Sequence, residues 1–196
     1  MIEEIGFLKF KKKKPKEIIK NIQVRIGLVG LGHVAGDQLK ALQQLPSFFK
    51  IVGICDANPQ KQAQIQDDVP FFTDIDDLLK SVEMDVVLVS APVDSHFEIT
   101  KIILESGRNV LLEKPATSNL DEFNVLVEIS QRKNLLFVVA FHAAFAKELL
   151  WFLEFKNRHS EKLGPLTGFR CAFYDPYVKN GILLPEAYSL GGSWLD

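Results

Sequence analysis

The feature that most constrains the fold is a glycine-rich turn between an apolar run and a helical pattern. The apolar run Val24–Val29 ends at Gly30, and Gly32 precedes an amphipathic stretch. A parallel strand that turns sharply into a helix needs one glycine for the turn and a second where a phosphate approaches the backbone, and the small Ala35 lets the helix pack closely. A tight turn without a ligand fits the same pattern. The residues expected to hold a pyrophosphate at the helix N-terminus are Gly30, Gly32, His33, Val34 and Ala35.

Strand-like and helix-like segments alternate from this turn to residue 141. Buried strands are predicted at residues 24–29, 50–56, 85–91, 109–112 and 135–141, where apolar residues run almost without interruption. Helices are predicted between them, among others at residues 33–45, 95–106 and 119–132. The alternation is typical of an α/β doubly wound parallel sheet.

Two of these helices carry capping signals. Ser95 with Glu98 has the spacing of a capping box, with Gly107 at the other end of that helix. Asn119 with Glu122 has the same spacing. We therefore expect helices to start at these two positions.

The predicted strand at residues 50–56 ends in an acidic residue, Asp56, which lies 21 residues after Ala35. A dinucleotide-binding fold places a carboxylate at this spacing to accept hydrogen bonds from the adenosine ribose. Since a carboxylate there repels a 2′-phosphate, the spacing favours NAD over NADP. The alternative is that Asp56 only caps the helix predicted after Asn58 and Pro59.

The charge is distributed unevenly, although the net charge of the 196 residues is only −2. The first 25 residues contain eight Lys and Arg against three Glu, and residues 11–14 are all lysine. We interpret residues 1–21 as a basic extension that stays solvated, and the alternative is a patch for an anionic surface or an organelle address. The nearly balanced total argues against nucleic acid as the main partner.

The cysteines and the apolar runs indicate the cellular compartment in which the protein is expected. Cys55 and Cys171 lie in apolar runs, which favours buried free thiols over a disulfide or a metal cluster. No run approaches the ~20 apolar residues of a membrane span, and the N-terminus lacks the features of a secretory signal. We therefore expect a cytoplasmic protein with no metal site and no membrane contact.

Several motifs occur in the order found in one family of oxidoreductases. They are the glycine turn at residues 30–35, Asp56, Pro-Val-Asp-Ser-His at 92–96, Gly-Arg-Asn-Val at 107–110, Glu-Lys-Pro at 113–115 and Gly-Gly-Ser-Trp-Leu-Asp at 191–196. On these motifs the chain resembles the glucose–fructose oxidoreductase, inositol dehydrogenase and MocA family from residue 24 to residue 196. The resemblance implies a Rossmann domain at residues 22–142, an α/β substrate-binding domain from residue 143, and an NAD cofactor.

The resemblance also implies roles for individual residues. Lys114 lies near the nicotinamide, where it acts as general base or holds the substrate hydroxyl, and Asp196 orients the substrate or shares the proton transfer. Pro92, His96 and Glu113 join the cofactor-binding residues. From the residues alone, Lys114 is equally an ordinary loop lysine, and His96 is equally a capping or packing residue. The implied activity is hydride transfer between NAD and a sugar, polyol or related secondary alcohol.

Two departures from the family pattern bear on catalysis. The family's histidine four residues beyond its aspartate would fall after Asp196, and Ala143 and Ala144 stand where the family often has an arginine. Residues 143–196 hold one predicted helix (146–158), one predicted strand (166–174) and a loop, so we interpret the substrate-binding domain as truncated. The alternative function is a non-catalytic dinucleotide-binding regulator or an inactive remnant. For a complete family member, the expected partners are a small-molecule substrate and further copies of the chain.

Overall fold

The computed structural model describes residues 23–65, 68–165, 167–168, 178–179 and 182–183. The basic extension at residues 1–21, most of the strand predicted at residues 166–174, Cys171 and Asp196 lie outside these ranges. What the sequence predicts for them stays a prediction.

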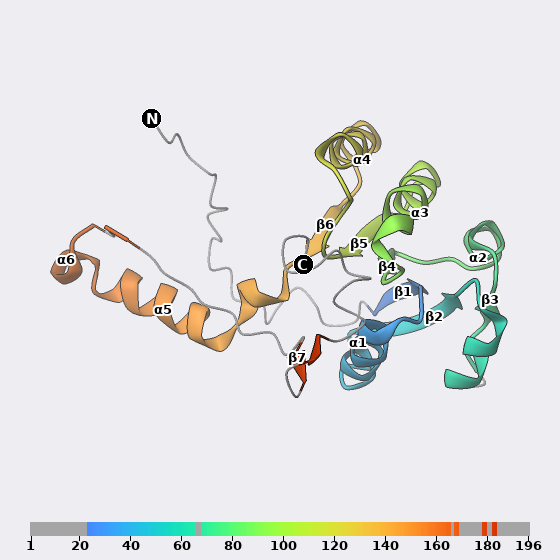
Figure 1. Cartoon of the computed structure of the whole chain (residues 1–196), viewed down its shortest axis with the longest axis horizontal. Helices are drawn as coiled ribbons and strands as arrows, with labels where there is room; N and C mark the ends of the chain where they lie inside the picture. The colour runs from blue at the N-terminus through green and yellow to red at the C-terminus, as the bar shows by residue number, and fades with distance from the viewer. Residues whose placement is uncertain (1–22, 66–67, 166, 169–177, 180–181, 184–196) are drawn as a thin grey trace.

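Six parallel strands form the central sheet, in the order β3-β2-β1-β4-β5-β6. They are β1 (Val24–Val29), β2 (Phe49–Cys55), β3 (Phe71–Phe72), β4 (Val86–Val89), β5 (Asn109–Glu113) and β6 (Phe137–Ala140). The chain moves outward from β1 to β3 and then crosses back to β4, so the strand order reverses between β1 and β4 (Figure 1). This is the doubly wound Rossmann topology, which confirms the predicted fold class.

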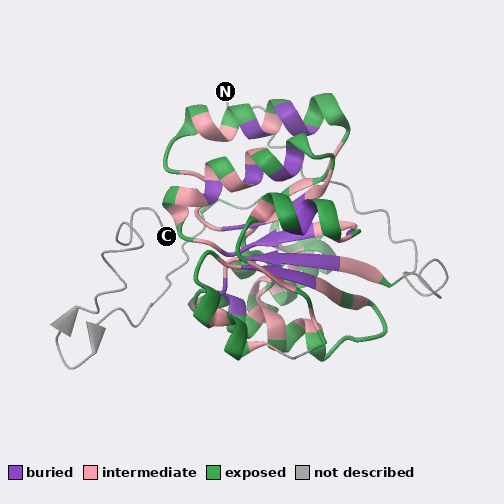
Figure 2. Ribbon diagram, turned by 90° about the vertical axis from the view of Figure 1, so that its right-hand side faces the viewer, coloured by how far each residue is buried: buried purple, intermediate pink, exposed green. Residues whose placement is uncertain are grey.

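Helices cover both faces of the sheet. α1 (His33–Gln43) packs on one face, and α2 (Ile75–Ser81), α3 (Val93–Glu105) and α4 (Leu120–Lys133) pack on the other (Figure 1). Successive residues of β4 therefore enter opposite cores. Val87 and Val89 belong to the core with α3 and α4, whereas Leu88 packs with α1. Burial on both faces explains the unbroken apolar runs of the sequence and the buried central strands of Figure 2.

The predicted capping box at the start of α3 is wrong. The helix begins at Val93, and its N-cap is Pro92, three residues before Ser95. The backbone N–H of Ser95 donates to the carbonyl of Pro92 at 2.9 Å, so Ser95 already belongs to the first turn. The corresponding prediction for α4 is confirmed, since the side chain of Asn119 accepts from the N–H of Glu122 at 2.9 Å.

The segment after β2 forms a 3₁₀ helix, η1 (Pro59–Gln64). Its N-cap is Asn58, whose side chain accepts from the N–H of Gln60 at 3.0 Å. Asp56 is therefore not the cap of this helix, and the alternative interpretation of Asp56 as a cap is wrong.

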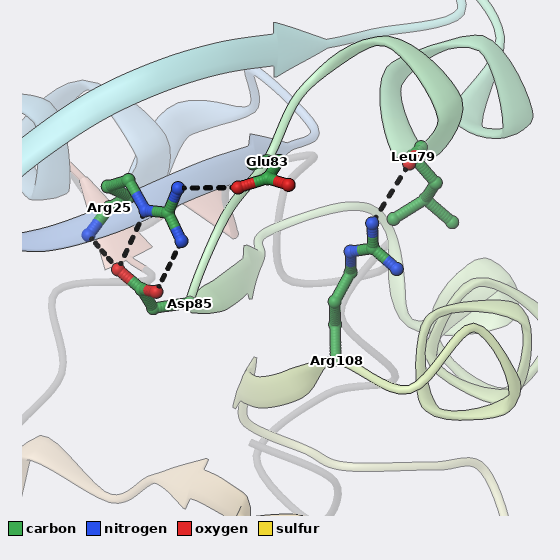
Figure 3. Close-up of polar contacts among 5 residues, drawn as sticks. All are labelled: Arg25, Leu79, Glu83, Asp85 and Arg108. Atoms are coloured by element: carbon green, nitrogen blue, oxygen red, sulfur yellow. Dashed lines mark hydrogen bonds and ion pairs between the residues drawn. The ribbon is translucent and has the colours of Figure 1, made fainter.

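An ion pair joins β1 to β4 at the amino ends of the strands (Figure 3). The guanidinium of Arg25 donates to Asp85 through Nε at 3.2 Å and Nη2 at 2.8 Å, and its Nη1 contacts Glu83 at 3.1 Å. The backbone N–H of Arg25 adds a bond of 2.7 Å to the same carboxylate of Asp85. These hydrogen bonds hold the pKa of Asp85 below its ordinary value.

The lowered pKa of Asp85 makes the fold more sensitive to acid. The pair's stabilisation is fully present above the ordinary carboxyl pKa and is lost as the pH falls through the lowered pKa of Asp85. We expect the wild-type chain to lose more free energy of unfolding than Asp85→Asn between about pH 5 and about pH 2. The difference will be small, because the two side chains are 41% and 43% exposed. Urea denaturation at several pH values measures it, and equal losses in both proteins would contradict it.

After β6 the chain passes through η2 (His142–Phe145) into α5 (Lys147–Arg158), which confirms the helix predicted at residues 146–158. α5 extends away from the sheet in Figure 1, and none of its residues is buried. The other described elements are α6 (Ser160–Leu163) and the antiparallel pair β7 (Val178–Lys179) and β8 (Ile182–Leu183). Within the described part of the chain, no helix is both long and apolar enough to cross a membrane.

Candidate functional site

The glycine turn joins the carboxyl end of β1 to α1, where the strand order reverses. Gly30 has a φ of +91°, and a Cβ added to it would lie 2.5 Å from the backbone nitrogen of Ala91, so only glycine fits. Gly32 is the N-cap of α1, which has no side-chain cap and no acidic residue in its first turn. The N-terminus of α1 thus offers backbone donors and the helix dipole to an anion.

The next three residues begin α1. His33 is the first residue of the helix, and the side chain of Val34 is exposed. Ala35 is fully buried in the core between α1 and the sheet, which confirms that a small residue brings helix and strand together here. Ala35 therefore acts on the site through the position of the helix.

Asp56 follows β2 and lies against the glycine turn. Its Oδ2 accepts from the backbone N–H of Leu31 at 2.7 Å, and its Oδ1 accepts from the N–H of Asn58 at 2.9 Å. Each carboxylate oxygen has two acceptor positions, so both have room for a ribose hydroxyl as well. Lys61, on η1, donates to the carbonyl of Leu31 at 3.0 Å and places a cation beside the same turn.

Cys55, the last residue of β2, is a free buried thiol, as predicted. Burial raises the pKa of this thiol to about 11, and the charges of Asp74 and Asp56 add to the effect. The thiol is protonated at neutral pH, which argues against a nucleophilic role.

His96 is buried in α3, with only 2% of its surface exposed. Its Nδ1 lies 2.8 Å from the carbonyl oxygen of Pro115, and its Nε2 lies 2.8 Å from that of Ala91. The ring therefore joins the loop after β4 to the loop after β5, which is the packing role considered from the sequence. Contact with a cofactor stays a prediction for His96 and for Pro92, which is exposed before α3.

Glu113, at the end of β5, is the centre of a polar network at the carboxyl edge of the sheet. Its side chain is buried, and its Oε1 accepts from the amide of Gln38 and, at 2.8 Å, from Nε2 of His142. Its Oε2 accepts from the backbone N–H of Lys114 at 3.2 Å. Gln38 in turn accepts from the hydroxyl of Ser90. The network joins α1, the ends of β4 and β5, and η2.

Lys114 directly follows β5 and is half-buried, and its peptide bond to Pro115 is cis. The structure thus places Lys114 next to Glu113 at the carboxyl edge of the sheet. Asp196, which the resemblance pairs with Lys114, lies outside the described residues.

The sequence patterns do not predict the roles of three residues at this edge of the sheet, Gln38, Ser90 and Lys61. Gln38 bonds to residues that lie 52 and 75 positions away along the chain. Lys61 reaches the turn from a position 30 residues after Leu31. No local pattern predicts contacts over such separations.

A parallel sheet of this strand order, with a glycine turn after β1, an uncapped helix N-terminus and an acid after β2, defines a dinucleotide-binding protein. Residues 24–141 match the family described as "Oxidoreductase family, NAD-binding Rossmann fold", or GFO_IDH_MocA. The match includes all six strands of the parallel sheet, and the chain belongs to this family.

Two curated relatives show how far the likeness extends. The uncharacterized oxidoreductase YhhX of Escherichia coli K12 is 32% identical over 145 residues, which are 71% of this chain and 41% of the relative. Inositol 2-dehydrogenase of Corynebacterium glutamicum is 29% identical over 112 residues, which are 56% of this chain and 33% of the relative. The chain thus spans less than half the length of either relative.

Two solved structures share the fold. The WlbA dehydrogenase of Bordetella pertussis, in complex with NADH and UDP-GlcNAcA, superposes with a TM-score of 0.65 at 21% identity, over 70% of this chain and 44% of that one. The scyllo-inositol dehydrogenase of Lactobacillus casei, with bound NAD(H) and scyllo-inositol, gives a TM-score of 0.65 at 19% identity, over 71% and 42%. At these identities the likeness shows the fold alone.

Proposed function

We propose that this chain is the cofactor-binding part of an NAD-dependent dehydrogenase that acts on a secondary alcohol of a sugar, a polyol or a related compound. The observation that carries the proposal is the meeting of three features where the strand order reverses: the turn at Gly30, the uncapped N-terminus of α1 and the carboxylate of Asp56. The turn at Gly30 allows the dinucleotide to approach the backbone closely, the N-terminus of α1 suits its pyrophosphate, and the carboxylate of Asp56 suits its adenosine ribose.

A bound NAD supplies the hydride acceptor of such a reaction. Each half of a doubly wound sheet binds one mononucleotide, so the adenosine half would lie over β1 and β2 beside Asp56 and the nicotinamide half over β4 and β5. Lys114 follows β5 on the nicotinamide half. This position supports a role for Lys114 as general base or as the cation that holds the substrate oxygen.

The substrate class is inferred from relatives named for inositol and for UDP-linked sugars. A cofactor-reduction screen of the product of the complete reading frame, with inositols, hexoses and UDP-linked sugars, tests the proposal. Reduction of NAD with one class identifies the substrate. NAD binding without reduction in any class supports the alternative, a non-catalytic dinucleotide-binding regulator or an inactive remnant. Absence of NAD binding contradicts the proposal.

We also propose a cytoplasmic location, since the free thiol of Cys55 suits a reducing compartment.

Asp56→Asn is expected to shift the preference from NAD toward NADP. The change removes the negative charge that would face a 2′-phosphate and leaves the cation of Lys61 beside the turn. Loss of the charged acceptor for the ribose hydroxyls should weaken NAD binding about 10-fold, while NADP binding strengthens. Titration calorimetry with both cofactors measures the ratio.

Lys61→Met is the matched control for this shift. As a single change, it removes one hydrogen bond to Leu31 and should weaken the binding of NAD and of NADP to a similar extent. Combined with Asp56→Asn, it should remove the gain in NADP affinity. A wild-type protein that already prefers NADP would show that the interpretation of Asp56 is wrong.

A further inference from the structure

The pair of Glu113 and His142 has the geometry of an imidazole oriented by a carboxylate. The side chain of Glu113 is 6% exposed and accepts from Nε2 of His142 at 2.8 Å, whereas the side chain of His142 is 61% exposed. The carboxylate is thus buried behind a ring that reaches solvent. In proton-transfer sites, a carboxylate in this position selects the tautomer and the orientation of the imidazole that moves the proton.

The protein holds the carboxylate of Glu113 from several sides. The amide of Gln38 donates to the same oxygen that accepts from His142, and the backbone N–H of Lys114 donates to the other oxygen at 3.2 Å. The hydroxyl of Ser90 donates to the amide oxygen of Gln38, which orients the amide nitrogen toward Glu113. A carboxylate bound in this way is a fixed support for the imidazole.

His142 also lies on the half of the sheet expected to bind the nicotinamide. It is the first residue of η2, and β6 ends two residues before it at Ala140. Ala140 is paired with Glu113 across the β5–β6 ladder. His142 and Lys114 therefore lie at the carboxyl ends of neighbouring strands, and both are hydrogen-bonded to Glu113.

We propose that His142 is an acid–base residue of the dehydrogenase reaction and that Glu113 positions it, an inference that rests on the function proposed above. In the oxidation direction, the O–H bond of the carbinol breaks and its proton moves to Nδ1 of His142. As the C–H bond breaks and the carbon–oxygen double bond forms, the electron pair of that bond would leave as hydride, for which a bound NAD would be the acceptor. The proton passes from the exposed ring to water. Lys114 then has the second of its two roles, as the cation that holds the oxygen.

The direction of the hydrogen bond decides which ring nitrogen takes the proton. Because an ionised carboxylate can only accept, Nε2 carries the proton that is shared with Glu113, and the lone pair of the neutral ring is on Nδ1. When Nδ1 receives a proton, the positive ring is already hydrogen-bonded to the carboxylate of Glu113. A proton taken up at Nδ1 thus leaves the hydrogen bond between Nε2 and Glu113 in place, and neither side chain has to rearrange.

Nuclear magnetic resonance on the whole chain tests this placement without turnover. With NAD bound, we expect nuclear Overhauser effects between the ring protons of His142 and the nicotinamide protons. Nitrogen-15 spectra should show the tautomer of His142 with the proton on Nε2. In Glu113→Gln that tautomer should lose population, because the amide lacks the charge that selects it.

Turnover of the complete reading frame's product provides the second readout. His142→Gln should lower kcat about 100-fold or more, with KM and NAD affinity nearly unchanged, because proton transfer is lost while binding is not. His159→Gln is the matched control: this histidine follows α5, outside the polar network, and its loss should leave kcat unchanged. Glu113→Gln should lower kcat less than His142→Gln does.

The outcomes separate this inference from the proposed function. A chain that does not bind NAD would overturn the proposed function and this inference with it. NAD binding without Overhauser effects from His142, or an unchanged kcat in His142→Gln, would overturn the inference alone.

Discussion

Replacing Gly30 with alanine is expected to lower the free energy of unfolding by about 3 kcal/mol or more and to abolish detectable NAD binding. A φ of +91° is strained for any residue with a Cβ. The new Cβ would also lie 2.5–2.7 Å from backbone atoms of Ser90 and Ala91, which cannot rotate away as a side chain can. Urea denaturation measures the loss of stability, and titration calorimetry measures the loss of binding.

Substitutions at two other glycines separate the effect of the strained φ from the effect of the close contact. Gly107 has a φ of +84° with nothing within 4 Å of an added Cβ, so Gly107→Ala carries the strain alone, about 1–2 kcal/mol. Gly36 lies inside α1, again with nothing within 4 Å, so Gly36→Ala should stabilise the chain by about 0.5–1 kcal/mol. Equal losses at Gly30 and Gly107 would show that the contact with Ala91 does not matter.

Lys114→Ala is expected to lower kcat by about 10²–10⁴-fold, because the site loses either its base or the cation that holds the substrate oxygen. NAD affinity should change by less than about 10-fold, since the turn, the α1 N-terminus and Asp56 are untouched. Cofactor reduction by the product of the complete reading frame measures the first effect, and calorimetry measures the second. Unchanged turnover would remove Lys114 from the mechanism.

Lys114→Arg distinguishes the two roles of this lysine. Arginine keeps the positive charge but does not give up a proton in proteins. Residual turnover in Lys114→Arg therefore fits a cation that holds the oxygen, with His142 as the base, whereas complete loss fits Lys114 as the base. Lys80→Ala, in the last turn of α2, is the control and should have no effect on kcat.

The parallel sheet could be predicted because its strands are buried on both faces. In β4, neighbouring residues enter the two opposite cores, which leaves an apolar run that local patterns detect. β3 has only two residues, too few for any pattern to mark it as a strand. The start of α3 was mispredicted because Ser95 and Glu98 have the right spacing, while Pro92 is the residue in the capping position.

The candidate site could be located from the sequence only where its residues lie at the ends of strands. Gly30, Asp56 and Glu113 all do, so a correct strand assignment locates them. Gln38 is in the middle of α1, and it reaches Glu113 because α1 packs against the sheet. Its hydrogen-bond partners depend on how the helix and the strands pack. The spacing of residues along the chain carries no information about this packing.

The peptide units around Leu31 are held from both sides, by Asp56 at the N–H and by Lys61 at the carbonyl. We therefore expect the turn to be pre-organised, with the same shape before and after a dinucleotide binds. Little conformational entropy is then lost from the protein on binding, so more of the contact energy contributes to affinity. The turn should therefore superimpose closely in structures determined with and without a dinucleotide.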